Sequence, residues 1–339
     1  MLSPVHRLSS MPRTAARSHT SGASEPCDGM AAMTQVGRQD GPLHPATARE
    51  VRTLAAQARE ADGVEALGEQ TLLNLTDPAA SVVHVLAGTP GGALEGYGQV
   101  ESGQTLTGEL VVAPRARGRG VGRALLDEIL ALAAENDADP ALWAHGDLPA
   151  ARALATAGGL EVRRELWQMS LEFADAQPPS TQTPDGVVVR PFVTGQDEDA
   201  WLRVNARAFV HHPEQGRMTR HDLEMREAEP WFCADDLLLA EQDGRLLASV
   251  WMKVEPGSDT GELYVLGVDP GAQGRGLGRL LTALTIEHLL TKGLERVLLY
   301  ASPTDAAAVR TYRSAGFVTS RSDVQYGPAS ASDGWSAEG

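Results

Sequence analysis

The chain has 339 residues, of which 42% are hydrophobic, and it carries a formal net charge of −16. The length suits two domains of ordinary size, each with its own core. The negative net charge argues against partners that bind basic surfaces, namely nucleic acids and anionic membranes. The two cysteines, Cys27 and Cys233, are too few for a disulfide framework.

Residues 1–42 are rich in Ser, Arg and Ala, and we expect a disordered leader there, or a true start at Met30 or Met33. No run of 18 apolar residues occurs anywhere in the chain. We therefore expect no membrane-spanning segment, and a cytoplasmic protein.

The first folded half is predicted to cover residues 43–173 and to begin with an amphipathic helix that Thr47 can cap. A meander of strands with Gly and Pro turns follows, then a Gly-rich segment, a long helix over 121–136, a short strand, a short helix and a final strand. The predicted strands cover residues 81–87, 94–101, 105–113, 140–146 and 160–173.

The same order recurs after a Pro/Thr/Gln-rich linker at 174–185. The second half, 186–326, includes a hairpin that turns at Asp243-Gly244, and a disordered tail is expected over 327–339. Its predicted strands cover residues 187–192, 236–242, 246–255, 261–268, 296–300 and 317–326. The chain is therefore an internal duplication of one α/β unit.

A Gly-x-Gly segment lies between a strand and a long helix in each half: "RGRGVG" in the first and "QGRGLG" in the second. Glycines let backbone N–H groups converge at a helix start, which forms an anion cradle. A Walker loop is excluded because neither segment has its lysine, and a dinucleotide fold would place the loop earlier in the unit. A glycine turn that only caps a helix is the alternative, but two aligned copies favour phosphate binding.

These segments resemble the pyrophosphate loop Arg/Gln-x-x-Gly-x-Gly/Ala of the GNAT superfamily of acyl-CoA N-acyltransferases. The resemblance covers both halves and implies two tandem α/β (α+β) GNAT domains, each a mixed, mostly antiparallel central sheet flanked by helices. It also implies acetyl-CoA as co-substrate, and no metal. The implied acetyl-CoA contacts are Leu110, Val111, Val112, Gly118, Arg119, Gly120, Val121, Gly122 and Arg123 in the first half, and Leu266, Gly267, Val268, Gln273, Gly274, Arg275, Gly276, Leu277, Gly278, Arg279, Asp305, Ala306, Ala307, Ala308, Val309 and Arg310 in the second.

The resemblance further implies Tyr312 as the catalytic acid, whereas Ala155 occupies the matching position of the first half. We therefore expect the second half to catalyse and the first to be non-catalytic. Glu262 is the candidate base, directly or through water, and Asp269 is the second choice. A repeated "TGEL" also contains Glu109, but it is shifted by three residues relative to the loops, so we expect Glu109 and Glu262 on opposite sheet faces.

Segments such as "WAHGDLPAARA", "FVHHPEQGRMT" and "GELYVLGVDPGAQGRGLG" resemble the mycothiol synthases, a family of tandem GNAT enzymes. The family acetylates the cysteinyl amine of cysteinyl-glucosaminyl-inositol. The substrate contacts that this resemblance implies are Glu69, Glu214, Lys253, Glu262 and Tyr300. Without the resemblance, Glu69 and Glu214 would be interpreted as surface acids, Lys253 as an edge lysine and Tyr300 as a core residue.

Two other functions stay open on the residues alone. One is acetylation of another amine, such as an aminoglycoside or a protein N-terminus, and the other is non-catalytic sensing of acyl-CoA. The adjacent His211 and His212 lack a partner motif and are assigned no metal, and Cys233 is expected to be buried and inert. A small-molecule amine is the only expected partner, and we expect a monomer.

Overall fold

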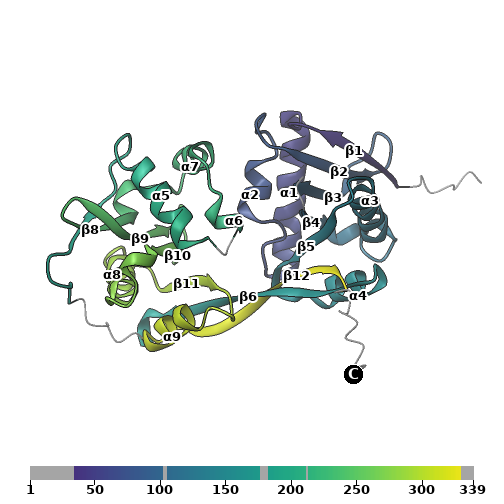
Figure 1. Cartoon of the computed structure of the whole chain (residues 1–339). Helices are drawn as coiled ribbons and strands as arrows, with labels where there is room; N and C mark the ends of the chain where they lie inside the picture. Colours follow the sequence, from purple (N-terminus) through teal and green to yellow (C-terminus); the bar gives the residue numbers. More distant parts are fainter. Residues whose placement is uncertain (1–33, 102–104, 176–181, 211–212, 330–339) are drawn as a thin grey trace, which may run out of the picture. The chain divides into compact units, whose positions relative to one another are not determined.

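The computed structural model describes residues 34–101, 105–175, 182–210 and 213–329. Figure 1 shows the helices distributed along both faces of the strands. The elements of the first half are β1 (Gln35–Asp40), α1 (Pro45–Asp62), α2 (Glu69–Leu73), β2 (Val82–Gly88), β3 (Leu94–Glu101), β4 (Thr105–Val112), α3 (Val121–Glu135), β5 (Asp139–Ala144), α4 (Pro149–Ala157) and β6 (Leu160–Glu172). Those of the second half are β7 (Val188–Pro191), α5 (Glu198–Ala208), α6 (Pro213–Gly216), α7 (Arg220–Glu227), β8 (Leu237–Gln242), β9 (Arg245–Lys253), β10 (Thr260–Val268), α8 (Leu277–Thr291), β11 (Arg296–Ala301), α9 (Ala306–Ser314) and β12 (Val318–Pro328).

All of the described strands join one sheet in the order β1-β2-β3-β4-β5-β12-β6-β11-β10-β9-β8-β7. Only β4 with β5 and β10 with β11 pair in parallel, and the other neighbours are antiparallel. The mixed, mostly antiparallel sheet expected for both halves is therefore confirmed, and the two halves share it.

The last strands of the two halves are exchanged. Strand β6, which ends the first half, pairs with β11 of the second, and β12, which ends the second half, pairs with β5 of the first. The two exchanged strands also pair with each other. The sequence predicted both strands but not this exchange, because an antiparallel edge accepts a strand from either half.

The hydrophobic cores follow the exchange. Val324 and Tyr326 of β12 lie in the core of the first half, whereas Met169 and Leu171 of β6 lie in the core built around α8. A third core packs α5 and α7 against the opposite face of β9 and β10. Each half therefore completes its core with a strand from the other half.

One turn was predicted correctly, whereas a helix cap and the burial of a cysteine were not. The hairpin turn between β8 and β9 is confirmed, since Asp243 and Gly244 both have positive φ angles of 51° and 72°. Helix α1 begins at Pro45, however, and is capped by His44 rather than Thr47. Cys233 is exposed rather than buried, because it lies in the loop before β8.

The expected boundaries at 43, 173, 186 and 326 remain predictions. Part of the expected leader folds, since β1 pairs with β2, and β12 extends into the expected tail as far as Pro328. Residues 1–33, residues 176–181 of the linker and residues 330–339 lie outside the described part of the chain.

Candidate active site

A β-bulge in β10 distinguishes the second half from the first. In the pairing of β10 with β9, Leu263 faces Met252 and Val265 faces Trp251, which leaves Tyr264 as an extra residue. Strand β4 pairs with β3 without interruption. A bulge leaves a backbone group unpaired and redirects neighbouring side chains, so β10 offers a local geometry that β4 lacks.

The bulge also corrects the expectation for Glu109 and Glu262. Counted from the glycine loops, Glu262 lies three residues before the position that matches Glu109. Because the bulge adds one of these three residues, the two positions are an even number of ladder steps apart, so both glutamates occupy the same face of the sheet. The contacts of the two glutamates support this placement. Glu109 accepts the backbone N–H of Gly68, and Lys253, which lies directly opposite Glu262, donates to Glu69, the residue after Gly68.

Glu262 is half-buried and lies between Lys253 on β9 and Leu298 on β11. Burial raises the pKa of Glu262 to about 7, although the nearby Lys253 ammonium acts in the opposite direction. A carboxyl group with this pKa can accept a proton near neutral pH.

Glu69, the first residue of α2, connects the first half to this site. Its carboxylate accepts a hydrogen bond from Lys253 Nζ at 2.6 Å and another from the Tyr264 hydroxyl. Arg226 of α7 donates to the same hydroxyl at 2.7 Å. Burial opposes the charge on Lys253, but the carboxylates of Glu69 and Glu255 outweigh it and raise the pKa of this lysine. The predicted Glu69, Lys253 and Glu262 are thus brought together.

Tyr264 and Arg226 were not predicted. Arg226 is almost fully buried and also donates to Gln70 at 2.7 Å, which fastens α7 to α2. Arg226 lies in none of the quoted motifs, Tyr264 lies in the segment "GELYV" without having been singled out, and the bulge has no sequence signature in an alternating strand.

Of the other predicted contacts, Tyr300 shares the face of Glu262, because it lies two residues beyond Leu298 on β11. Glu214 falls in α6, but its side chain, like His211 and His212, lies outside the described part of the structure. Asp269 is buried, accepts the Gly271 N–H at 2.9 Å and pairs with Arg207, so it is less available as a base than Glu262.

Tyr312 of α9 is buried in the core on the α8 side of the sheet, with its ring 5.9 Å from that of Phe317. Its burial raises the pKa of the phenol, which therefore stays protonated at neutral pH. Among the described residues the Tyr312 hydroxyl has no hydrogen-bond partner. Its proton is free for a ligand.

The two Gly-rich segments have the same backbone geometry. Gly120 and Gly276, with φ angles of 86° and 82°, precede α3 and α8 directly, and no side chain caps either helix start. Gly118 and Gly274 also have positive φ, and a Cβ built on any of these four glycines meets no described atom within 4 Å. Uncapped N–H groups beside open space suit a pyrophosphate at both loops.

The side chains around the two loops differ. Arg117 is held in a bidentate ion pair with Asp62 at 2.6 and 2.7 Å, whereas the matching residue of the second half is the neutral Gln273. Arg275 donates to Gln242 at 2.7 Å. The arginine that opens the first loop is therefore already engaged within the protein.

The remaining predicted acetyl-CoA contacts lie beside the loops. Residues 110–112 and 266–268 end β4 and β10, directly before the loops. The segment 305–310 opens α9, where the Asp305 carboxylate already accepts the N–H groups of Ala307 and Ala308. This segment therefore has fewer free donors than the Gly-rich loops.

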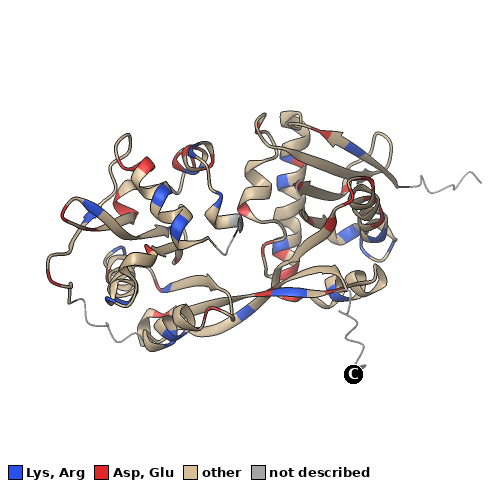
Figure 2. Cartoon of the chain, viewed as in Figure 1, with Lys and Arg blue, Asp and Glu red and all other residues tan. Residues whose placement is uncertain are grey.

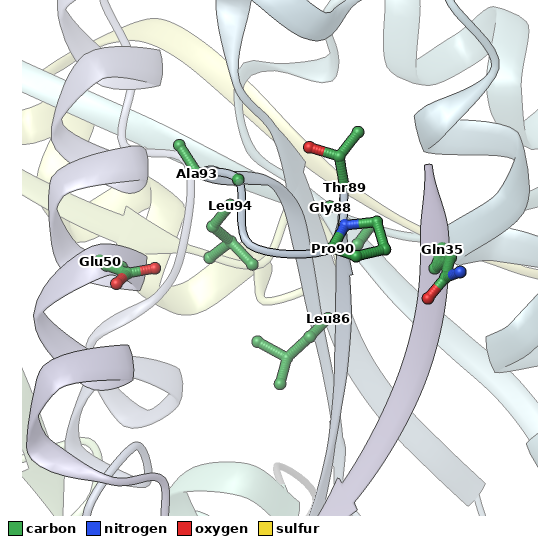
Figure 3. A pocket seen from close by; sticks show the side chains of 10 residues that line it. Gln35, Glu50, Leu86, Gly88, Thr89, Pro90, Ala93 and Leu94 are labelled. Carbon is green, nitrogen blue, oxygen red and sulfur yellow. The ribbon is translucent and has the colours of Figure 1, made fainter. Parts of the chain in front are cut away.

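Other features do not suggest a different site. Within the described residues, no group of His, Cys, Asp or Glu side chains is arranged to hold a metal ion, and no helix is long and apolar enough to cross a membrane. Figure 3 shows a pocket beside the turn between β2 and β3, lined by Gln35, Glu50 and Thr89 among others, which includes none of the predicted site residues. In the view of Figure 2, acidic and basic residues are interspersed over both halves.

Comparisons with known proteins agree with this geometry. A model of the acetyltransferase (GNAT) family matches residues 50–158 and again 201–317. A mycothiol acetyltransferase of Cellulomonas flavigena is 53% identical over 88% of this chain and 90% of its own length. The corresponding protein of Sanguibacter keddieii is 45% identical over 86% of this chain and 96% of its own length.

Two solved structures share the fold. A GCN5-related N-acetyltransferase from Sphaerobacter thermophilus has a TM-score of 0.62 and 24% identity, covering 86% of this chain and 95% of its own. A tandem GNAT protein from the clavulanic acid biosynthesis pathway has a TM-score of 0.67 and 18% identity, covering 86% of this chain and 98% of its own.

Proposed function

The chain belongs to the GNAT acetyltransferases and, within them, to the mycothiol acetyltransferase family, and we propose that it acetylates the cysteinyl amine of cysteinyl-glucosaminyl-inositol to give mycothiol and CoA. Acetyl-CoA supplies the acetyl group as a thioester. The observation that carries the proposal is Glu262, a carboxyl group with a pKa near 7 on the strand that contains the bulge.

The substrate amine is an α-amine with a pKa of about 7.7, so much of it arrives protonated at neutral pH. Glu262 accepts the excess proton, directly or through one water, and the neutral nitrogen forms the new C–N bond at the thioester carbonyl. The unpaired backbone group at the bulge, beside Tyr264, is available to donate to the oxygen that becomes negative.

The C–S bond then breaks and the sulfur leaves as a thiolate. Tyr312 supplies its proton, because its buried phenol is protonated at neutral pH and free of other described partners. The transfer needs no acyl-enzyme, and the first N–H groups of α8 with Gly274 and Gly276 bind the pyrophosphate of the donor.

We assign this chemistry to the second half alone. The first half has Ala155 in place of Tyr312, no bulge in β4, and Arg117 paired with Asp62. Its contribution to the active site is Glu69, which places a carboxylate beside Lys253 and the cationic substrate. A cytoplasmic location and a monomeric state remain predictions.

Mass spectrometry of products from purified protein, acetyl-CoA and cysteinyl-glucosaminyl-inositol tests the function directly. We expect a gain of one acetyl group on the cysteinyl nitrogen, and none on glucosaminyl-inositol that lacks cysteine. Binding of acetyl-CoA without this product would overturn the substrate assignment, and would favour another amine or an acyl-CoA sensor.

A further inference from the structure

Strand β6 comes from the first half but lies between β12 and β11, and β11 separates it from the catalytic strand β10. Gln168 of β6 is directly opposite Tyr300 of β11 on one side and Arg321 of β12 on the other. Directly paired residues of neighbouring strands point to the same face, so Gln168 shares the face of Tyr300 and Glu262.

Gln168 is bonded to the Tyr300 hydroxyl. Its Nε2 donates to the phenol oxygen at 2.8 Å. A phenol oxygen that accepts a hydrogen bond from an amide keeps its own proton to donate elsewhere, and among the described residues no acceptor takes it. Gln168 therefore holds Tyr300 as a donor.

Ser320 completes the group. It occupies an irregular step between Thr319 and Arg321 in the pairing of β12 with β6. Its hydroxyl donates to the Gln168 backbone carbonyl at 3.2 Å and lies 3.4 Å from Gln168 Oε1. The cluster thus presents one free phenol proton beside an amide oxygen and a serine hydroxyl.

This part of the sheet face is uncovered. Tyr300 is 39% exposed although its strand has neighbours on both sides, and Ser320 is also exposed. A central strand is normally covered on both faces by packed elements, so exposed polar side chains here leave room for a ligand.

We propose that Tyr300, Gln168 and Ser320 form a subsite for the hydroxyl groups of the substrate's polyol part, with Gln168 as the positioning residue for Tyr300. The proposal rests on the function proposed above and identifies residues that recognise the part of the substrate beyond its amine. Hydroxyl groups both donate and accept, which matches a phenol donor beside amide and hydroxyl oxygens. Arg321, opposite Gln168 on β12, has one of its guanidinium nitrogens bonded to the Gly63 carbonyl at 3.0 Å.

Calorimetric binding of cysteinyl-glucosaminyl-inositol to the enzyme–CoA complex tests this subsite. We expect Gln168→Leu to weaken binding about 10- to 100-fold, because the Tyr300 proton loses its fixed direction. Gln168→Glu keeps the shape but accepts the Tyr300 proton, so it should weaken binding at least as much. The losses should appear in KM with little change in kcat.

Two controls separate a subsite from general damage. Gln39→Leu makes the same change in β1 at the far edge of the sheet and should leave binding unchanged, and every variant should bind acetyl-CoA normally. In a double-mutant cycle, Gln168→Leu should cost little more once Tyr300→Phe is present, since both changes remove one interaction.

The subsite is overturned by wild-type affinity in both Gln168 variants, by equal losses of acetyl-CoA binding, or by additive losses with Tyr300→Phe. Wild-type protein that binds the polyol amine without acetylating it would refute the proposed function alone, and the variants would still decide the subsite. Wild-type protein that does not bind this amine would refute both.

Discussion

Glu262 owes its chemistry to its position rather than to its residue type. A surface glutamate is ionised well below neutral pH, but burial in β10 brings the pKa of Glu262 to about 7 while Lys253 limits the rise. Glu262 can therefore gain and lose a proton near neutral pH.

We expect kcat at saturating substrates to rise with pH through about 7, because Glu262 must lose its proton before it can accept one from the amine. Glu262→Gln should lower kcat about 10²- to 10⁴-fold. The pH–rate profile of this variant should then rise only with the deprotonation of the substrate amine, whose pKa is about 7.7. The pH–rate profiles of both proteins check this. An unchanged limb near 7 in the variant would assign the base to another residue.

Tyr312→Phe should lower kcat about 10²-fold or more while acetyl-CoA still binds, because only the proton for the leaving thiolate is removed. The ring packs beside Phe317, which the replacement preserves. Turnover and calorimetric binding of acetyl-CoA measure the two effects separately. Normal turnover would place the acid elsewhere, and lost acetyl-CoA binding would give Tyr312 a structural role.

At the scale of elements, the bulge in β10 separates two halves that are similar in sequence. Both halves have the strand, the glycine loop and the helix, but only β10 contains an extra residue. This single insertion interrupts the pairing of β10 with β9 at Tyr264, whose hydroxyl donates to Glu69 of α2.

Deletion of Tyr264 should remove the bulge and keep Glu262 opposite Lys253, because the residues on both sides are already in register with β9. We expect kcat to fall about 10²- to 10³-fold through loss of the backbone donor. Tyr264→Phe is the matched control, since it keeps the bulge and loses only the hydroxyl. Steady-state kinetics compare the two, and equal activity in both would argue against a role for the bulge.

The order of elements could be predicted from the sequence because strands, turns and helices have distinct periodicities. The hairpin at Asp243-Gly244 and the loops before α3 and α8 are examples. The bulge and the exchange of β6 and β12 could not be predicted, because both depend on which backbone a strand pairs with. The edge strand β1 was missed because the segment Gln35–Asp40 is short and polar.

At the scale of the whole molecule, the exchange makes the halves dependent on each other. Strand β12 pairs with β5 and β6, while His145 bonds to Asp323 of β12 at 2.9 Å and to Glu109 of β4 at 3.0 Å. Burial opposes a charge on His145, but the carboxylates outweigh it and raise its pKa to about 10. The imidazolium therefore links β12 to the first half throughout the neutral range.

A chain divided between residues 178 and 179 should be active only when both fragments are produced together. Each fragment alone would expose the edge where the other half's strand pairs, and unpaired edges promote aggregation. Co-elution of the fragments in size-exclusion chromatography and recovery of acetyl transfer check this. A second fragment that is monomeric and active alone would show that the exchange is dispensable.

The site residues that lie in quoted motifs could be predicted from the sequence, whereas those brought into the site by strand pairing or helix packing could not. Glu262, Lys253 and Glu69 were expected and are joined by contacts, but Arg226, Tyr264 and Gln168 carry no local signal. All three missed residues depend on a bulge, an exchanged strand or a helix packed across the halves.

The central claim is that one of two similar loops serves the chemistry, and the rate of acetyl transfer in Gly276→Asp and Gly120→Asp tests it most directly. Aspartate tolerates the positive φ of both positions, and its charge repels a pyrophosphate. We predict that Gly276→Asp raises the KM for acetyl-CoA about 100-fold or more, while Gly120→Asp leaves the rate close to wild type. Equal losses, or a loss only in Gly120→Asp, would contradict the assignment of catalysis to the second half.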